Sequence, residues 1–446
     1  MSERTRTGEG WSEARAEGRL RSLELFGMRF GLDRMRRMMT ALGGAGGGPF
    51  PPYETIQVLG TNGKTSTTRM IAAILERHGL RTGAYTSPHL TAYRERVLLG
   101  ERQLDASDFG AAIARADRAA EQVNRTLAED DHVTQFELLT AAALWELSEQ
   151  DVQVAVIEAG LGGRYDATSV VAAAVTVLTN VGLEHTRWLG PTIADIAEEK
   201  LAVVREGGTL AIGEDLAPEA LAVAERIAAE RDARIVRAAP LADAVALASR
   251  GPFQRRNFAL ARAAAEAYLE RAGIALSEDA VLAAAAETFV PGRLQTVGER
   301  PLTVLDGAHN PAAVAALVEA MPGVFGETPP ALVLGVLEDK DATEMLRRLL
   351  PAGARAWFTA PPSERALPPA ALQAQAARLG FEDTECDPRP ERALAAARVW
   401  AEAHGTGVLA TGSVYLVGDL LGKLSPASSQ HDGEALAGLR AMGTGR

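Results

Sequence analysis

The chain has 446 residues, 47% of them hydrophobic and 23% charged, so it is long enough for two or three globular domains. Its 46 basic and 58 acidic residues give a formal charge of -12, which disfavours a nucleic-acid or anionic-membrane partner. Cys386 is the only cysteine, which excludes an intrachain disulfide and a cysteine metal cluster. The sequence has neither the apolar run of a signal peptide nor one long enough to span a bilayer, so we expect a cytoplasmic protein.

In the first half of the chain, short apolar runs alternate with helical patterns. Strands are predicted at residues 56–59, 83–86, 152–157 and 172–178. Helices are predicted after the first strand up to Gly79, at 136–147, at 191–205 with Pro191 in the first turn, and at 253–273. This alternation favours an α/β fold with a largely parallel sheet.

The alternation restarts after Pro291-Gly292-Arg293, where we place a domain boundary. Strands are predicted at 302–305 and 331–336, a helix at 311–321, and a late strand pair at 408–417, interrupted at Gly412. We therefore expect a first domain at 1–293, a second domain at 296–425 and a disordered tail at 426–446.

Two glycine-rich segments have different interpretations. Residues 43–48 follow no strand and contain no lysine, so a flexible connector is predicted there. Residues 58–68, VLGTNGKTSTT, lie between a predicted strand and a predicted helix, which favours a phosphate-binding loop over a plain turn. Only two residues separate Gly60 from Gly63, whereas the common P-loop has four at this place. Lys64 supplies a positive charge, and Thr65 or Ser66 supplies a hydroxyl group.

Polar residues also follow three other predicted strands, at the sheet edge where ligands of open α/β folds bind. Ser87 follows the second strand, although Ser87-Pro88 alone is also typical of a turn. Glu158 ends an apolar strand and is either a magnesium ligand or one partner of a structural salt bridge. His185 follows the next strand and is either a metal ligand or a structural histidine.

Lys200 lies beside two glutamates, and this pattern predicts a solvated charged helix face. In the second half, Asp306 and His309 lie between a predicted strand and a predicted helix. They fit contacts to ribose, base or phosphate, or equally well a turn that caps the helix. These residues together indicate an enzyme that uses ATP and magnesium at a site between two α/β domains.

Several long motifs resemble those of folylpolyglutamate synthases and dihydrofolate synthases, a branch of the Mur ligase superfamily, and the resemblance extends over residues 30–424. The motifs are GTNGK at 60–64, TSPHL at 86–90, EAGLGGRYDAT at 158–168, GLEHT at 182–186, PGR at 291–293 and DGAHNP at 306–311. This resemblance implies a P-loop ATPase-like N-terminal domain and a smaller Rossmann-like α/β C-terminal domain.

The resemblance also implies roles for individual residues. The ATP contacts are Gly60, Thr61, Asn62, Gly63, Lys64, Thr65, Ser66, Asn257, Arg293, Asp306 and His309. The magnesium ligands are Ser87, Glu158, His185 and Lys200, the last as a carbamate, and Lys64, His185 and Lys200 are the implied catalytic residues. The folate or dihydropteroate contacts are Arg94, Thr134, Phe136, Asp166 and Ala167.

Three positions depart from the family pattern. Thr65 replaces a common glycine, as in other Mur ligases, and slightly weakens the assignment to this branch. Ser169 and Leu201 replace a usual asparagine and a usual alanine, which affects only the fine shape of the pocket.

The implied reaction is ATP-dependent ligation of L-glutamate to a folate, and also to dihydropteroate, by a monomer with two magnesium ions and a monovalent cation. A related ligase acting on a UDP-muramyl substrate is the nearest alternative. Such enzymes carry a UDP-binding domain before the loop, and the 59 residues before Gly60 are fewer than such a domain needs. A binding protein switched by ATP hydrolysis is the alternative from another class.

Overall fold

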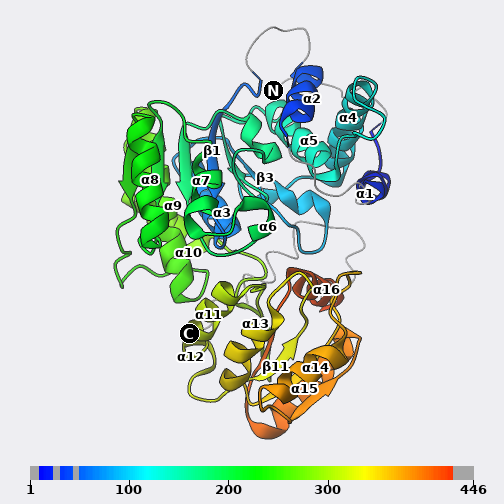
Figure 1. The fold of residues 1–446 in the computed structure, drawn as a ribbon. Coiled ribbons are helices and arrows are strands. Elements are labelled where there is room, and N and C mark those ends of the chain that lie inside the picture. Colours follow the sequence, from blue (N-terminus) through cyan, green and yellow to red (C-terminus); the bar gives the residue numbers. More distant parts are fainter. Residues whose placement is uncertain (1–9, 24–30, 44–49, 425–446) are drawn as a thin grey trace. The chain divides into compact units, whose positions relative to one another are not determined.

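The computed structural model describes residues 10–23, 31–43 and 50–424. These residues form two compact units, shown by their helices and strands in Figure 1. The first unit contains the described residues up to Arg293 together with Ala315–Gly323. The second contains Leu294–Val314 and the described residues from Val324 onward.

The first unit is built on an eight-stranded sheet in the order β4-β3-β2-β5-β1-β6-β7-β8. The strands are β1 Glu54–Leu59, β2 Thr82–Tyr85, β3 Val97–Leu99, β4 Arg102–Gln103, β5 Val154–Glu158, β6 Val175–Leu178, β7 Thr209–Ile212 and β8 Arg234–Arg237. The pairs from β2 to β8 are parallel, and β3 and β4 extend one edge in antiparallel fashion. The carboxyl ends of β2, β5, β1 and β6 therefore lie side by side.

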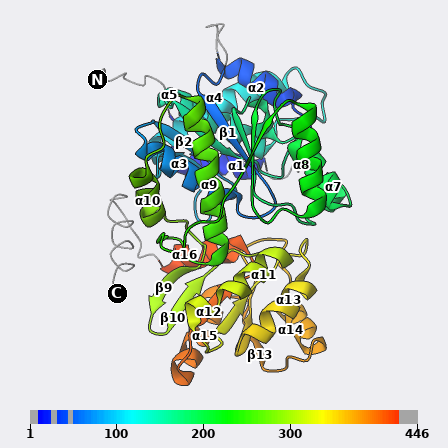
Figure 2. The same ribbon diagram turned by 90° about the vertical axis from the view of Figure 1, so that its left-hand side faces the viewer.

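Helices cover both faces of this sheet (Figure 2). They are α1 Glu13–Ser22, α2 Asp33–Gly43, α3 Lys64–Arg77, α4 Ala106–Asn124, α5 Gln135–Glu149, α6 Thr186–Leu189, α7 Ile193–Leu201, α8 Pro218–Glu230, α9 Pro252–Arg271 and α10 Glu278–Glu287, with short 3-10 helices η3 Tyr93–Arg96 and η4 Ala167–Val170. Residues of α3, α9 and α10 pack on one face, and residues of α1, α2, α4, α5, α7 and α8 pack on the other. Burial on both faces explains why β5 and β6 are largely apolar.

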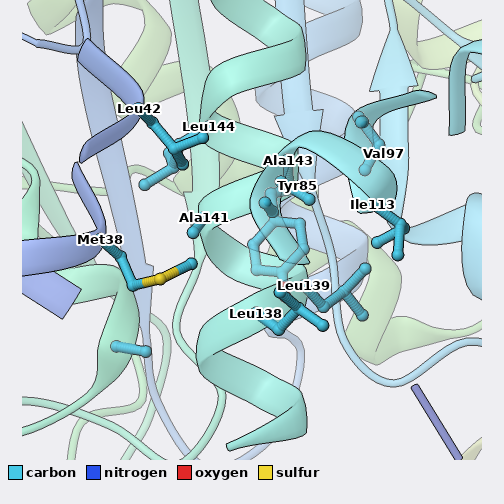
Figure 3. Packing of buried hydrophobic residues seen from close by; sticks show 14 of the residues in the cluster. Met38, Leu42, Tyr85, Val97, Ile113, Leu138, Leu139, Ala141, Ala143 and Leu144 are labelled. Carbon is cyan, nitrogen blue, oxygen red and sulfur yellow. The ribbon is translucent and has the colours of Figure 1, made fainter. Parts of the chain in front are cut away.

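One part of this core joins α2, α4 and α5 to the sheet (Figure 3). Met38 of α2 and Leu144 of α5 are buried there beside Tyr85 of β2. The Tyr85 hydroxyl pairs with the Thr140 hydroxyl at 3.1 Å, which satisfies its polar end inside the core. The amino-terminal helices are thus part of the core of the first unit.

The second unit has a six-stranded sheet in the order β13-β12-β11-β14-β10-β9, parallel except for the β9–β10 pair. Its strands are β9 Gln295–Glu299, β10 Leu302–Leu305, β11 Ala331–Leu334, β12 Arg355–Phe358, β13 Thr384–Cys386 and β14 Val408–Thr411. Its helices are α11 Pro311–Ala320, which continues into the first unit, α12 Pro322–Phe325, α13 Ala342–Leu349, η5 Leu350–Ala352, α14 Pro369–Arg378, α15 Pro390–His404 and α16 Val414–Leu424. The predicted α/β class with a largely parallel sheet is confirmed.

One predicted element was wrong, and one predicted helix begins later than expected. The late strand pair is one strand, β14, followed by helix α16, in which Val414, Val417 and Leu420 are buried at helical spacing. The run between Gly412 and Leu420 was too apolar to show which period it followed. Pro191 also lies outside the first turn of its helix, because Thr192 is the N-cap of α7 and its hydroxyl accepts from the Asp195 N–H.

Two predictions fall on parts of the chain that the structure does not describe. Residues 44–48 of the predicted glycine connector and the predicted tail at 426–446 lie outside the described residues. Among residues 10–23, 31–43 and 50–424, no helix combines the length and hydropathy needed to cross a membrane.

Candidate active site

The loop between β1 and α3 depends on two glycines with positive φ angles. These angles are 144° at Gly60 and 82° at Gly63, the residue before the first turn of α3. A Cβ atom on Gly60 would lie 1.9 Å from Thr179 Oγ1, and one on Gly63 would lie 2.4 Å from Asn257 Oδ1. Both positions require glycine for their backbone conformation and for the close approach of a neighbour.

Residues that follow β6 hold this loop in place. The backbone carbonyl of Asn180 accepts from the N–H of Thr61 at 3.0 Å, and its side-chain oxygen accepts from the N–H of Asn62 at 2.9 Å. Thr179 donates its hydroxyl to the carbonyl of Asn62 at 2.6 Å. The loop is therefore fixed before the N-terminus of α3, where free N–H groups and the helix dipole favour an anion.

Lys64 is the first residue of α3 and lies against the backbone of its own loop. Its Nζ donates to the carbonyls of Gly60 at 3.1 Å and Thr61 at 3.2 Å. The ammonium group is only partly buried. A phosphate bound at the loop would meet both this charge and the helix N-terminus.

Glu158, the last residue of β5, places a carboxylate beside the loop. It is 1% exposed, and it accepts from the Thr65 hydroxyl at 2.9 Å and from the Ser87 N–H at 3.0 Å. Burial raises its pKa to about 7, although Lys64 and the two hydrogen bonds act in the opposite direction. Glu158 is thus a buried carboxyl group held by two hydrogen bonds, an arrangement that suits a ligand for a cation.

Lys200 is buried, and the predicted solvated face is wrong. It is 2% exposed on α7, and its Nζ donates to the carbonyls of Gly60 at 3.1 Å and Leu161 at 3.0 Å. Burial and the charge of Lys64 lower its pKa to about 7. The two neighbouring glutamates obscured a usable signal, because Lys200 lies four and three residues after the buried Ile196 and Ala197.

The loop after β5 packs against α7, which carries Lys200, and also against α5. A Cβ on Gly162 would lie 2.8 Å from Lys200 Nζ, and one on Gly163 would lie 1.8 Å from the carbonyl of Glu199. A Cβ on Gly160 would lie 2.6 Å from Cζ of Phe136, so the phenyl ring packs directly on the loop backbone. Three glycines therefore allow three neighbours to reach the same short segment.

His185 follows β6 and precedes α6. Its φ of 53° is in the left-handed region, and its Nε2 lies 3.9 Å from the nearest carboxylate oxygen of Glu184. Its side chain is about one-third exposed. The parallel register places β6 beside β1, so His185 and the phosphate loop follow adjacent strand ends.

The five predicted folate contacts lie on three segments of the first unit. Thr134 is the N-cap of α5, and Phe136 lies in the first turn of that helix. Asp166 caps η4 and also accepts from the N–H groups of Leu161 and Gly162, next to the buried residue Ala167. Arg94, in η3, pairs with Glu13 at 3.0 Å. Asp166 and Phe136 therefore contact adjacent residues of the loop after β5.

The predicted nucleotide residues of the second unit form a turn before α11. Asp306 accepts from the N–H groups of Leu294 and Ala308, both at 2.9 Å, and Nδ1 of His309 lies 2.9 Å from the carbonyl of Gly307. The side chain of Asn310 accepts from the N–H of Ala313 and caps the helix. The predicted turn role is thus observed for Asp306, and it leaves the nucleotide role open.

Comparison with known proteins identifies the family. The Mur ligase middle domain matches residues 58–215, and the Mur ligase glutamate ligase domain matches residues 292–414. The folylpolyglutamate synthase of Lacticaseibacillus casei is 33% identical over 363 residues, which cover 76% of this chain and 84% of that protein. The dihydrofolate synthase/folylpolyglutamate synthase of Bacillus subtilis is 34% identical, covering 73% and 79%. The chain belongs to the folylpolyglutamate synthase and dihydrofolate synthase family.

Solved structures of this family share the fold. The Mycobacterium tuberculosis folylpolyglutamate synthase, complexed with ADP and AMPPCP, has a TM-score of 0.84 at 30% identity and covers 92% of this chain and 99% of its own. A folylpolyglutamate synthase complex with AMPPCP and folate has a TM-score of 0.79 at 28% identity, covering 93% and 100%. The predicted fold and family are therefore confirmed.

The structure brings some of the predicted family residues into direct contact. Thr65, Ser87 and Glu158 form one hydrogen-bonded group, and Lys64 and Lys200 share the carbonyl of Gly60. Other predicted ATP contacts are less directly joined: Ser66 is buried in α3, Asn257 of α9 lies beside the loop, and Arg293 bonds to the carbonyl of Gly292. The roles of these side chains stay predictions.

Magnesium fits the donor set of this family site in chemical type. Glu158 is a buried carboxylate, and Ser87, whose backbone N–H bonds to Glu158, carries a hydroxyl group; both side chains offer hard oxygen ligands. Within the described residues, no group of three or more His, Cys, Asp or Glu side chains is gathered for a metal. Only Glu158 and His185 of the predicted ligand set belong to those four residue types, so the set depends on the serine and on a modified lysine.

The sequence interpretation missed the residues that support the family site. Thr179 and Asn180 hold the phosphate loop, and a polar pair directly after a buried strand was the signal for them. Arg34 and Glu137 form a buried ion pair 103 residues apart in sequence, and no local pattern indicates such a pairing. Both omissions concern residues that act by holding other residues.

The pKa of Glu158 gives a testable pH dependence of stability. Its folded value of about 7 lies above the ordinary 4.5, so the folded state binds more protons between these pH values, and stability should fall as pH rises through this window. In metal-free protein, Glu158→Gln should make the fall in the free energy of unfolding smaller by roughly 2–3 kcal/mol. Urea unfolding at about pH 5 and about pH 7 measures it, with exposed Glu230→Gln as control. An equal change in the free energy of unfolding between the two pH values, in wild type and in Glu158→Gln, would refute this prediction.

Proposed function

We propose that this enzyme ligates L-glutamate to reduced folates with consumption of ATP, and that it also glutamylates dihydropteroate. The convergence of two lysines on one carbonyl of a phosphate loop, next to a buried carboxylate, is the observation that carries this proposal. The family comparison supplies the substrate class, since relatives are named for both activities.

The reaction has two steps. In the first, an acceptor carboxylate oxygen attacks the γ-phosphorus of ATP, the bond from phosphorus to the β,γ-bridging oxygen breaks, and an acyl phosphate and ADP form. In the second, the neutral amine of L-glutamate attacks the acyl carbon and loses a proton, and inorganic phosphate leaves with the former carboxylate oxygen. The product is an amide, and each turnover consumes one ATP.

The residues of the phosphate loop act mainly by charge and position. Lys64 and the N-terminus of α3 would stabilise negative charge on the transferring phosphoryl group. Thr65 and the Ser87 N–H keep the Glu158 carboxylate facing the loop. Magnesium, held in our proposal by Ser87, Glu158, His185 and modified Lys200, would supply further positive charge to the phosphate oxygens when bound.

Carbamate formation at Lys200 is chemically reasonable in this setting. With a pKa of about 7, a large fraction of the side chain is a neutral amine near neutral pH. A neutral amine can attack CO2, lose a proton and become an anionic carbamate. Because an ammonium group has no lone pair and repels a cation, modification would convert this lysine into a possible metal ligand.

Other features of the protein stay predictions. ATP binding is supported by relatives solved with ADP and AMPPCP, whereas two magnesium ions and a monovalent cation rest on family resemblance alone. We propose a monomer in the cytoplasm that binds small molecules, and the charge of -12 argues against a nucleic-acid partner.

An acceptor assay tests both activities. Purified enzyme with ATP and L-glutamate should release ADP when tetrahydrofolate is added, and again when dihydropteroate is added, with a product heavier by one glutamyl residue in each case. Omission of glutamate serves as the control. Extension of tetrahydrofolate without consumption of dihydropteroate would disprove the second activity.

The same assay separates the alternatives. A ligase for UDP-muramyl substrates would release ADP only with such an acceptor. A nucleotide-switched binding protein would hydrolyse ATP at a rate unaffected by glutamate and by pteridines. Either result would overturn the proposed function.

A further inference from the structure

Arg34 forms a largely buried ionic network with one acidic residue in the first turn of α5 and another just before that helix. Its Nε lies 2.9 Å and 3.0 Å from the two carboxylate oxygens of Glu137, and its Nη1 lies 2.9 Å from Asp131. The side chains of Arg34 and Glu137 are 8% and 4% exposed. One guanidinium of α2 thus joins two acidic residues on either side of the turn that leads into α5.

Glu137 passes this restraint to the N-cap of α5. Its Oε2 accepts both the N–H of Thr134, at 2.9 Å, and the Thr134 hydroxyl, at 3.0 Å. The Glu137 N–H donates back to Thr134 Oγ1 and completes a capping box. The conformation of Thr134 is therefore set by a carboxylate that Arg34 holds from the other side.

The same helix turn contacts the loop after β5. The ring of Phe136 packs against the backbone of Gly160, two residues after Glu158. The next carbonyl, that of Leu161, accepts from Lys200 Nζ. Contacts thus run from α2 through the first turn of α5 to the loop that holds the lysine.

From these contacts we propose that Arg34 is a positioning residue for the pteridine acceptor. Arg34 would orient Thr134 and Phe136 through Glu137, without itself contacting the substrate. This inference rests on the proposed function, because Thr134 and Phe136 border the acceptor only if the enzyme binds a pteridine there. It assigns the amino-terminal helix α2 a role in acceptor binding, in addition to its part in the core.

The geometry explains why an arginine is needed. Its planar fork can bond both oxygens of Glu137 and still reach Asp131, whereas a lysine presents a single point charge. Removing only Arg34 would leave Glu137 buried without its charge partner. Glu137 would then move toward water or another donor, and its bonds to Thr134 would change.

Steady-state kinetics of four variants test this role: Arg34→Lys, Arg34→Gln, Glu137→Gln and the double variant Arg34→Gln/Glu137→Gln. We expect Arg34→Gln to raise the acceptor KM roughly ten- to hundredfold, with the KM for ATP within about twofold of wild type. Arg34→Lys should raise the acceptor KM less than Arg34→Gln does. The double variant, which buries no unpaired charge, should be no worse than Arg34→Gln, so the two effects should not add.

Arg37→Gln is the matched control, because Arg37 lies one turn away on α2 and forms an exposed pair with Asp33. It should leave every KM within about twofold of wild type. An unchanged acceptor KM in folded Arg34→Gln, or an equal rise in the KM for ATP, would overturn the inference. If Arg34→Gln does not fold, the double variant decides by the same two criteria. Inactive wild-type enzyme with both acceptors would instead refute the proposed function.

Discussion

Lys64→Ala should lower ligation at least about a hundredfold and leave the fold intact. The side chain is partly exposed, and its Nζ bonds to two carbonyls of its own loop, so its removal creates no core cavity. It does remove the positive charge that would face the transferring phosphoryl group. ADP release with acceptor and glutamate measures activity, and circular dichroism during heating measures the fold.

Lys423→Ala provides the control for Lys64→Ala. Lys423 is an exposed residue of α16 that pairs with Glu391 of α15 and Asp419 of α16, so its loss should leave turnover near that of wild type. A folded Lys64→Ala enzyme with near-normal turnover would contradict the proposed phosphate loop. A general loss in both variants would point instead to damage during preparation.

Lys200→Ala should lose most turnover, and a small carboxylate such as acetate should restore part of it. The substitution removes a buried side chain and leaves space beside the carbonyls of Gly60 and Leu161. If the active form is a carbamate, its essential feature is an anionic oxygen, which acetate can supply from the same space. Turnover across a series of acetate concentrations measures the rescue.

Two controls distinguish a carbamate from a structural lysine. Acetate should not rescue Lys64→Ala, where a cation rather than an anion is missing. Wild-type enzyme prepared without CO2 should lose activity and regain it when bicarbonate is added. Normal turnover of Lys200→Ala without carboxylate would show that Lys200 takes no part in the reaction, and a loss that no carboxylate reverses would favour a purely structural role.

Local pattern was enough to predict the sequence of elements around the phosphate loop. A buried strand, two glycines and a helical repeat follow one another within residues 54–77, and the structure shows β1, the loop and α3 there. The sequence also singled out Glu158, because a charged side chain at the end of an apolar strand is costly unless it has a partner or a ligand. Each of these signals is local, because it lies within a few residues of the feature that it predicts.

Side chains whose environment comes from distant segments were not predictable in this way. Lys200 is buried because the loop at 160–163 packs against α7, and its acidic neighbours suggested the opposite. The Arg34–Glu137 pair joins two helices that are far apart in sequence. Helix α16 was mistaken for a strand because its apolar residues are continuous rather than spaced at one period.

The glycines of the loop after β5 have a consequence for redesign of the enzyme. Gly160 gives space to the ring of Phe136, Gly162 to the amine of Lys200 and Gly163 to the backbone of α7. A larger side chain at any of the three glycines would displace a different neighbour. All three neighbours nevertheless pack against the same four residues of backbone. A substitution of Phe136, which we propose borders the acceptor, would therefore also disturb the loop that packs against Lys200. If both residues act as proposed, we expect substitutions of Phe136 to change the turnover rate together with the acceptor preference.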